Sequence, residues 1–149
     1  MLPLLPAALA LIAAVVACGL SKAETHYNAA VRLARQGNWS GAVAEYSEAV
    51  RVQPDFPSAY NNRGAAQAML GNYAEAISDY GEAVRQDATY AEAYNNRGIA
   101  YSDLGEYDKA IADFDSAIAR TSDKLASLAQ EALAEHRAGL TEKLDPEQL

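Results

Sequence analysis

The chain of 149 residues has little of what catalytic and disulfide-stabilised proteins depend on, since it contains one cysteine and two histidines. A single cysteine excludes an intramolecular disulfide. His26 and His136 lie far apart in the sequence, so they do not form the closely spaced pair typical of zinc sites. The sequence also has no glycine-rich phosphate loop. We therefore expect no enzymatic activity, no metal and no other cofactor.

Positive charge and chain-breaking residues are also scarce. There are 12 Lys and Arg against 20 Asp and Glu, which gives a formal net charge of −8. An acidic chain repels phosphate backbones, so nucleic acid is not expected as a partner. Five prolines and nine glycines, with half of the residues hydrophobic, favour closely packed helices. The sequence thus predicts an all-α fold.

The first 20 residues contain no charged side chain and form an apolar run. Its length lies between a signal-peptide core and a helix that spans a bilayer. The run ends in VVACG, which resembles a bacterial lipobox, in which the cysteine, here Cys18, is lipidated. We predict that residues 1–20 are a signal peptide or membrane anchor, and that the protein is a lipoprotein at the periplasmic face. The alternative is an uncleaved helix of a single-pass membrane protein, with Cys18 as a small buried residue.

A period of 34 residues dominates the rest of the sequence. It divides the chain into blocks 23–56, 57–90 and 91–124, and the last two are identical at 14 of 34 positions. Within each block an apolar helical pattern breaks at a glycine-polar-aromatic turn and then resumes, which predicts a helical hairpin. Three hairpins at a fixed period predict a stack of repeated units.

The residues that recur at this period resemble those of the tetratricopeptide repeat family over residues 23–124. The residues that carry this resemblance in the second and third blocks are Tyr60, Gly64, Gly71, Tyr73, Ala76, Tyr80, Ala83, Tyr94, Gly98, Gly105, Tyr107, Ala110, Phe114 and Ala117. The first block is looser, with Ala30 in place of the second-block glycine Gly64. The resemblance implies a right-handed α-solenoid of three hairpins, in which these small and aromatic residues pack the core.

Asn28, Asn62 and Asn96 recur at this period, and packing does not explain them. Asparagine is a mediocre residue for a helix interior. By the resemblance, the first helix of each hairpin lines the concave face of the solenoid, and the asparagines look inward. A side-chain amide can pair with the N–H and C=O groups of an extended peptide, and the arrangement is similar to the asparagine ladder of the O-linked N-acetylglucosamine transferase superhelix. The alternative is that repeat duplication simply copied them.

Other residues complete the predicted peptide-binding face. Val31 and Ile99 supply an apolar patch, and Asn61 and Asn95 are weaker candidates beside the main asparagines. A site that clamps a C-terminal carboxylate would need inward lysines or arginines. They are missing, since we expect Arg63 and Arg97 to pair with nearby carboxylates instead.

The chain beyond the third block predicts one more helix. Apolar residues recur at three- and four-residue steps over 123–144, which favours an amphipathic capping helix on the last hairpin, followed by a flexible tail at 145–149. A partner-binding or dimerising helix is the alternative.

Together these patterns predict a non-enzymatic, membrane-tethered adaptor that binds a peptide or helix of a partner protein in the concave groove. The competing hypothesis is a self-associating structural scaffold of the cell envelope, in which the chain forms a homo-oligomer.

Overall fold

The computed structural model describes the backbone of residues 22–142 and the side chains of residues 22–135. The predicted signal peptide or anchor, with Cys18, and the predicted tail at 145–149 lie outside the described residues. Within the described part of the chain, no helix combines the length and hydrophobicity needed to cross a bilayer.

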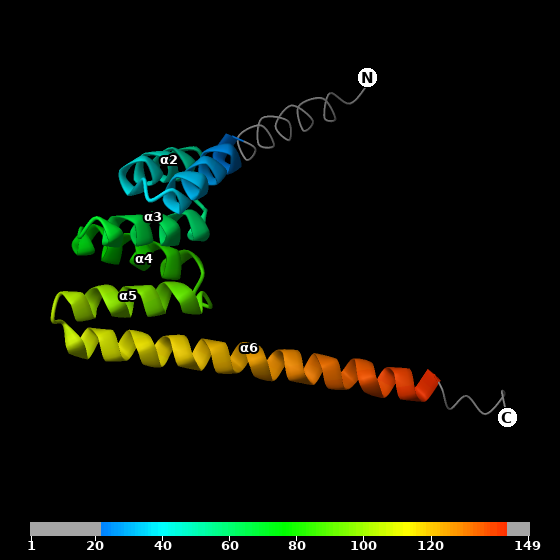
Figure 1. Ribbon diagram of the computed structural model, residues 1–149. Helices are drawn as coiled ribbons and strands as arrows, with labels where there is room; N and C mark the ends of the chain where they lie inside the picture. The colour runs from blue at the N-terminus through cyan, green and yellow to red at the C-terminus, as the bar shows by residue number, and fades with distance from the viewer. Residues whose placement is uncertain (1–21, 143–149) are drawn as a thin grey trace, which may run out of the picture.

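The described residues form helices and contain no strand, which confirms the predicted all-α fold. The first helix covers residues 22–35. It is followed by α2 (Trp39–Val52), α3 (Pro57–Met69), α4 (Tyr73–Gln86), α5 (Ala91–Asp103) and α6 (Tyr107–Glu142). Figure 1 shows consecutive helices running back and forth as three hairpins stacked one on another. Each helix packs mainly on its neighbours in the chain, as expected of a helical solenoid.

The turn inside each hairpin depends on a glycine. Gly37, Gly71 and Gly105 have φ of 75°, 81° and 76°, in the left-handed region that other residues rarely adopt. The aromatic residue two positions after each glycine is the first residue of the second helix. Trp39 begins α2, Tyr73 begins α4 and Tyr107 begins α6. The predicted glycine turns are therefore present in all three hairpins.

Small residues bring the two helices of each hairpin close together. A Cβ atom built on Gly64 would lie 2.9 Å from Cε1 of Tyr80, and one on Gly98 would lie 2.8 Å from Cε1 of Phe114. Both distances are shorter than van der Waals contact, so the aromatic ring occupies the space that a side chain would need. The core role predicted for these residues matches their packing.

The C-terminal region corrects the expectation of a separate capping helix at 123–144. Instead, α6 runs without interruption from Tyr107 to Glu142 and leaves the stack as a projecting rod (Figure 1). Between Tyr107 and Gly139 the sequence has no glycine or proline to break a helix. Residues 121–135 are exposed, so this described part of α6 does not cover the last hairpin.

Candidate functional site

A ladder of hydrogen bonds joins the first helices of successive hairpins. Asn62 donates from Nδ2 to the hydroxyl of Tyr27 at 2.8 Å, and Asn96 donates from Nδ2 to Oδ1 of Asn61 at 3.1 Å. Asn61 in turn donates from Nδ2 to Oδ1 of Asn62 and to Oε1 of Glu92, each at 3.3 Å. Because Asn61 is completely buried, its amide has to be satisfied inside the protein. The predicted asparagines therefore hold neighbouring repeats together.

Two of the predicted asparagines stay outside this ladder. Asn28 and Asn95 are exposed, and within the described residues neither side chain has a hydrogen bond. Asn28 belongs to the first of the described hairpins, and Asn95 belongs to the last. The structure thus brings together Asn61, Asn62 and Asn96, and it places the other two at the ends of the stack.

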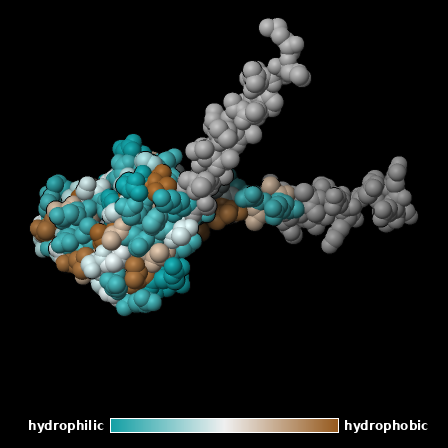
Figure 2. All heavy atoms as spheres, turned by 90° about the horizontal axis from the view of Figure 1, so that it is seen from above, coloured by the Kyte–Doolittle hydropathy of each residue, from teal (hydrophilic) through white to brown (hydrophobic). Residues whose placement is uncertain are grey.

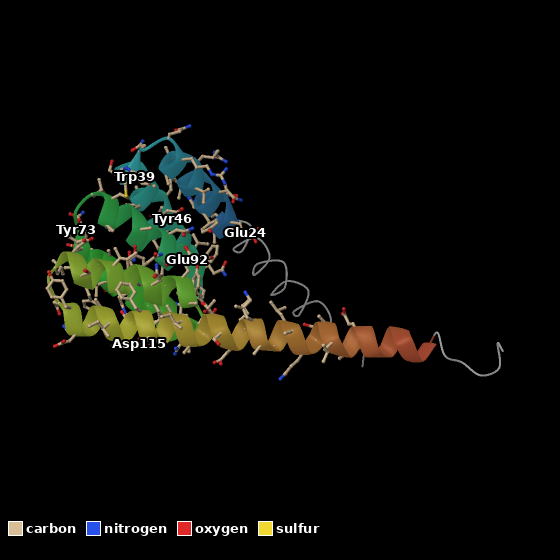
Figure 3. The ribbon with its side chains drawn as sticks, turned by 60° about the horizontal axis from the view of Figure 1, so that its bottom comes forward. Glu24, Trp39, Tyr46, Tyr73, Glu92 and Asp115 are labelled. Atoms are coloured by element: carbon tan, nitrogen blue, oxygen red, sulfur yellow. The ribbon has the colours of Figure 1, made fainter. Side chains whose placement is uncertain are left out.

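An open hollow of about 320 Å³ lies between the first and second hairpins. It is lined by Val31, Ala34, Arg35, Trp39, Tyr46, Asn62, Ala65 and Ala66. Two residues predicted from the sequence, Val31 and Asn62, therefore share one apolar hollow, with the Asn62 amide as a polar group in its wall. Figure 3 shows Trp39 and Tyr46 along α2, from which they reach this hollow. Ile99, the other predicted apolar residue, is 48% exposed and belongs to the third hairpin.

Sequence reasoning missed Trp39 and Arg35 as parts of this hollow. As the aromatic residue of the first turn, Trp39 is expected to take part only in the turn and the core, whereas the structure also places it in the lining of the hollow. Arg35 follows Val31 by four residues and so lies on the same side of the first helix. That spacing was the available signal for Arg35.

Tyr46 forms part of the wall of the hollow and is almost completely buried. Burial raises the pKa of Tyr46 to about 12, because the low-dielectric surroundings disfavour the phenolate. The hydroxyl therefore stays neutral at physiological pH, and the hollow is a largely apolar surface without a fixed charge on its tyrosine.

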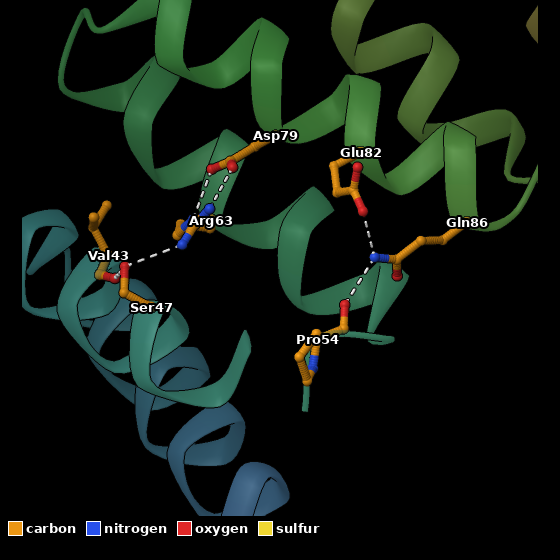
Figure 4. Close-up of polar contacts among 7 residues, drawn as sticks. All are labelled: Val43, Ser47, Pro54, Arg63, Asp79, Glu82 and Gln86. Carbon is orange, nitrogen blue, oxygen red and sulfur yellow. Dashed lines mark hydrogen bonds and ion pairs between the residues drawn. The ribbon is translucent and has the colours of Figure 1, made fainter. Parts of the chain in front are cut away.

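Arg63 and Arg97 form equivalent ion pairs inside their hairpins. Arg63 donates from Nε and Nη2 to the two carboxylate oxygens of Asp79 at 2.8 and 2.6 Å (Figure 4). Arg97 makes the same two-pronged contact with Asp113 at 2.7 Å for both bonds. The hydrogen bond to Asp79 raises the pKa of Arg63 above its usual value.

The arginine side chains are only 21% and 20% exposed, which is more buried than the sequence suggested. Their carboxylate partners are more buried still. Each guanidinium is already saturated by a bidentate carboxylate, so neither arginine is available to bind the carboxylate of a ligand.

Among residues 22–135, no three His, Cys, Asp or Glu side chains lie close enough to hold a metal ion. His26 contacts Glu45 at 2.7 Å, but no nucleophile lies beside this pair in the described contacts. What the site offers chemically is an apolar hollow, amide groups and a shape that can hold another chain.

Comparisons with known families and structures agree with this arrangement. Models of the TPR repeat match residues 32–71 and 69–105, and a model of the tetratricopeptide repeat matches residues 91–120. A sequence comparison with curated proteins gives no match.

Among solved structures, the TPR2B domain of yeast Sti1, in a complex with pHsp70, is 29% identical, with a TM-score of 0.69 over 74% of this chain and 90% of that one. The Arabidopsis OM64 TPR domain is 28% identical, with a TM-score of 0.69 over 79% of this chain and 98% of that one. The first TPR of Spaghetti (RPAP3), bound to the HSP90 peptide SRMEEVD, is 26% identical, with a TM-score of 0.66 over 77% of this chain and 95% of that one. With repeat models covering more than half of the chain and the same hairpin solenoid in these structures, the chain belongs to the tetratricopeptide repeat family.

Proposed function

We propose that this protein is a non-enzymatic adaptor that binds an extended segment of a partner protein on the concave side of its first helices. The observation that carries the proposal is the hollow between the first two hairpins, where Val31 and Ala65 form an apolar floor beside the Asn62 amide. The similar domains of Sti1 and Spaghetti hold peptides of Hsp70 and HSP90, which supports a peptide as the ligand.

The chemistry of the hollow favours an apolar side chain of the bound segment. A volume of about 320 Å³ accommodates one medium-sized or aromatic side chain with its neighbouring backbone. The Asn62 amide is held in the wall of the hollow by its hydrogen bond to Tyr27 and a contact with the Tyr46 hydroxyl, so it presents a fixed polar edge to the backbone of the segment. Burial of the apolar side chain supplies affinity, and the amide orients the segment.

The charges along the asparagine ladder favour an internal segment over a free C-terminus. Arg63 and Arg97 are held by Asp79 and Asp113, and Glu92 lies beside the asparagine ladder (Figure 3). A terminal carboxylate would meet the negative charge of Glu92 without a free arginine of the ladder to balance it. In the hollow itself, the exposed cation Arg35 can pair with an acidic side chain of such a segment. The expected partner therefore presents an apolar anchor with an uncharged or acidic neighbour.

We further propose that residues 1–20 tether this adaptor to a membrane through lipidated Cys18, at the periplasmic face. The support is the uncharged apolar run and its VVACG end. Mass spectrometry of the membrane-extracted protein tests the tether, and an intact Met1 with unmodified Cys18 would contradict it.

The binding proposal is tested with peptides selected on the full chain in mild detergent from a phage-displayed library, with affinity measured by fluorescence anisotropy. Ala65→Glu places a charge in the hollow and should weaken binding at least tenfold. Ala44→Glu is the matched control, because Ala44 is an exposed alanine of α2 that does not line the hollow. Equal affinity of both variants for the selected peptides would refute the concave site.

A further inference from the structure

The last hairpin ends in an uncovered apolar surface. On its outer side, α5 and α6 enclose a hollow of about 640 Å³, which we call the open end, lined by Ala91, Glu92, Asn95, Ala117, Ile118, Thr121, Ser122 and Leu125. Ile118 is 67% exposed, and Ile111, about two turns earlier on the same face of α6, is 58% exposed. Between earlier hairpins the equivalent surface is covered by the first helix of the next repeat, as α5 covers α4. Among the described residues, the open end therefore lacks the helix that the repeat architecture puts there.

The sequence of that missing helix is present in the projecting part of α6. Counting one 34-residue period from Asn96 gives Gln130, from Gly98 gives Ala132 and from Gly105 gives Gly139. Residues 125–139 thus carry the amide, the small residue and the turn glycine of a fourth repeat in the correct register. We call this segment the fourth-repeat helix.

The fourth-repeat helix exposes its apolar residues. Leu125, Leu128 and Leu133 are 62%, 52% and 53% exposed, and Figure 2 shows hydrophobic residues on the part of α6 that projects from the stack. Exposed leucines on one helix and an uncovered apolar hollow on the same chain indicate two halves of one interface. Because α6 is continuous through Glu142, the segment points away from the open end of its own chain.

The register between successive repeats specifies how a second chain would fit. Across the earlier boundaries, Ala49 clusters with Ala59, and Ala83 clusters with Ala93. One period further, the equivalent pair is Ala117 with Ser127. These two residues lie symmetrically about Ser122, so two antiparallel α6 helices that cross at Ser122 have the register of a normal repeat boundary.

A second set of positions gives the same centre. Ala76 and Ala100 share a core cluster, and their equivalents one period later are Ala110 and Ala134, which again lie symmetrically about Ser122. Both pairs of positions therefore face each other when two straight α6 helices run antiparallel and cross at Ser122. Each copy then contributes the same residues to the contact. Interfaces of this kind, in which one patch meets itself about a two-fold axis, are the most common in homodimers.

We propose that the open end is occupied by the fourth-repeat helix of a second copy of this chain, in an antiparallel dimer of α6 helices centred on Ser122. Asn95, which has no side-chain hydrogen bond within the described residues, then meets Gln130 of the second copy, as Asn61 meets Asn96 within one chain. The same register sets the exposed Glu135 of the second copy opposite Lys109. Each copy thus completes the last repeat of the other.

The test uses the full chain in mild detergent with Cys18→Ser as background. In this background, Ser122→Cys should form an interchain disulfide on mild oxidation, because the two-fold axis passes through this position. Ser40→Cys is the matched control, an exposed serine on α2 at the other end of the stack. Light scattering during size-exclusion chromatography should give a dimer mass for the parent chain. A Leu128→Glu/Leu133→Glu variant, which leaves residues 1–20 unchanged, should give a monomer mass with unaltered helicity.

An insertion of Gly-Asn-Gly after Ser122 separates this arrangement from self-capping. The insertion supplies a hairpin turn, so the fourth-repeat helix can fold back on its own chain, and the dimer should become a monomer. The proposal is overturned if the parent chain is a monomer at micromolar concentration. It is equally overturned if the Ser122→Cys chain cross-links no faster than the Ser40→Cys chain, or if the dimer survives the two leucine substitutions.

Discussion

Asn96 donates a hydrogen bond across the boundary between the second and third hairpins to Asn61, with 3.1 Å between Nδ2 and Oδ1. The equivalent bond across the preceding boundary runs from Asn62 to the hydroxyl of Tyr27, because Tyr27 stands where the next repeat has Asn61. In the second and third repeats, an asparagine at the same position therefore donates a hydrogen bond to a polar side chain of the previous repeat. This contact gives the recurring asparagines a structural role in addition to the proposed contact with a peptide.

The first prediction concerns the buried member of this ladder. Asn61→Ala removes an amide that serves Asn62, Glu92 and Asn96, and it leaves the Asn96 donor without its partner. Leaving a buried polar group unsatisfied costs about 1–3 kcal/mol. Urea unfolding followed by circular dichroism should show a loss of unfolding free energy in this range.

The matched control is Asn28→Ala, an exposed asparagine of the first helix that lies outside the ladder and away from the open end. Its unfolding free energy should change by less than about 0.5 kcal/mol, as is usual for surface positions. Equal effects of the two substitutions would show that the ladder does not stabilise the stack.

The sequence could predict the hairpins because their determinants are local and repeated. Each turn needs a glycine with positive φ, and Gly37, Gly71 and Gly105 mark these turns at a constant spacing. By contrast, neighbouring positions such as Asn61 and Asn62 differ by about 100° around the helix. Which of them is buried depends on how the next hairpin is rotated against the first. The sequence alone does not give this rotation, so it could not predict that Asn61 is the buried residue.

The C-terminal half of α6 could not be assigned for a different reason. The apolar spacing of Leu125, Leu128 and Leu133 is the same whether the segment forms its own helix or extends the preceding one. In the first hairpin Pro54 follows directly after the helix end, but no proline or glycine follows Arg120 before Gly139. A helix that meets no breaker continues, and the pattern alone does not say which surface its leucines cover.

The second prediction concerns two glycines that differ in their surroundings. Gly64→Ala places a Cβ 2.9 Å from Tyr80 and 3.1 Å from the backbone oxygen of Ala76, so the hairpin has to open slightly. Overpacking of this kind typically costs about 1–3 kcal/mol. Thermal unfolding should show a lower Tm for this variant.

Gly81→Ala is the comparison within the same pair of hairpins. Gly81 lies inside α4, and the nearest atom to a new Cβ is Nη1 of Arg97 at 3.7 Å, an ordinary contact distance. Alanine favours a helix interior over glycine by about 0.5–1 kcal/mol, so this variant should melt at a higher temperature than the parent chain. A loss of stability here would indicate that the spacing of α4 and α5 is tighter than described.

The third prediction concerns the ion pair of Arg63 with Asp79. Asp79→Ala leaves a guanidinium that is only 21% exposed without its bidentate partner, which typically costs about 3–5 kcal/mol. The double variant Arg63→Met/Asp79→Leu removes both charges and should recover much of this loss. Chemical unfolding of both variants measures the difference, and an unaffected Asp79→Ala variant would mean that the pair contributes nothing.

The exposed pair of Arg51 with Glu48 provides the control for that experiment. Its residues lie on one helix turn, at 2.7 Å, with side chains 64% and 45% exposed. Exposed pairs of this kind add little to stability, so Glu48→Ala should leave the unfolding midpoint unchanged. The contrast between the two carboxylates tests whether burial, and not the ion pair itself, sets the size of the effect.

The fourth prediction concerns stability at high pH. Burial raises the pKa values of Tyr46, Tyr80 and Tyr90 to about 12 from the ordinary tyrosine value of 10.0. The folded state therefore holds these protons more tightly than the unfolded state. Their contribution to stability is fully present below pH 10 and is lost as the pH rises toward 12, by about 1.4 kcal/mol per pH unit for each tyrosine.

Urea unfolding at pH 8, 10 and 11 should show a constant midpoint up to about pH 9 and a steep fall above pH 10. Tyr80→Phe removes one of the three ionisations, so its midpoint should fall less steeply over the same interval. Tyr107→Phe is the control at a tyrosine that is 64% exposed, and its curve should follow that of the parent chain. If Tyr80→Phe and the parent chain lose stability in parallel above pH 10, the alkaline transition does not arise from the buried hydroxyl of Tyr80.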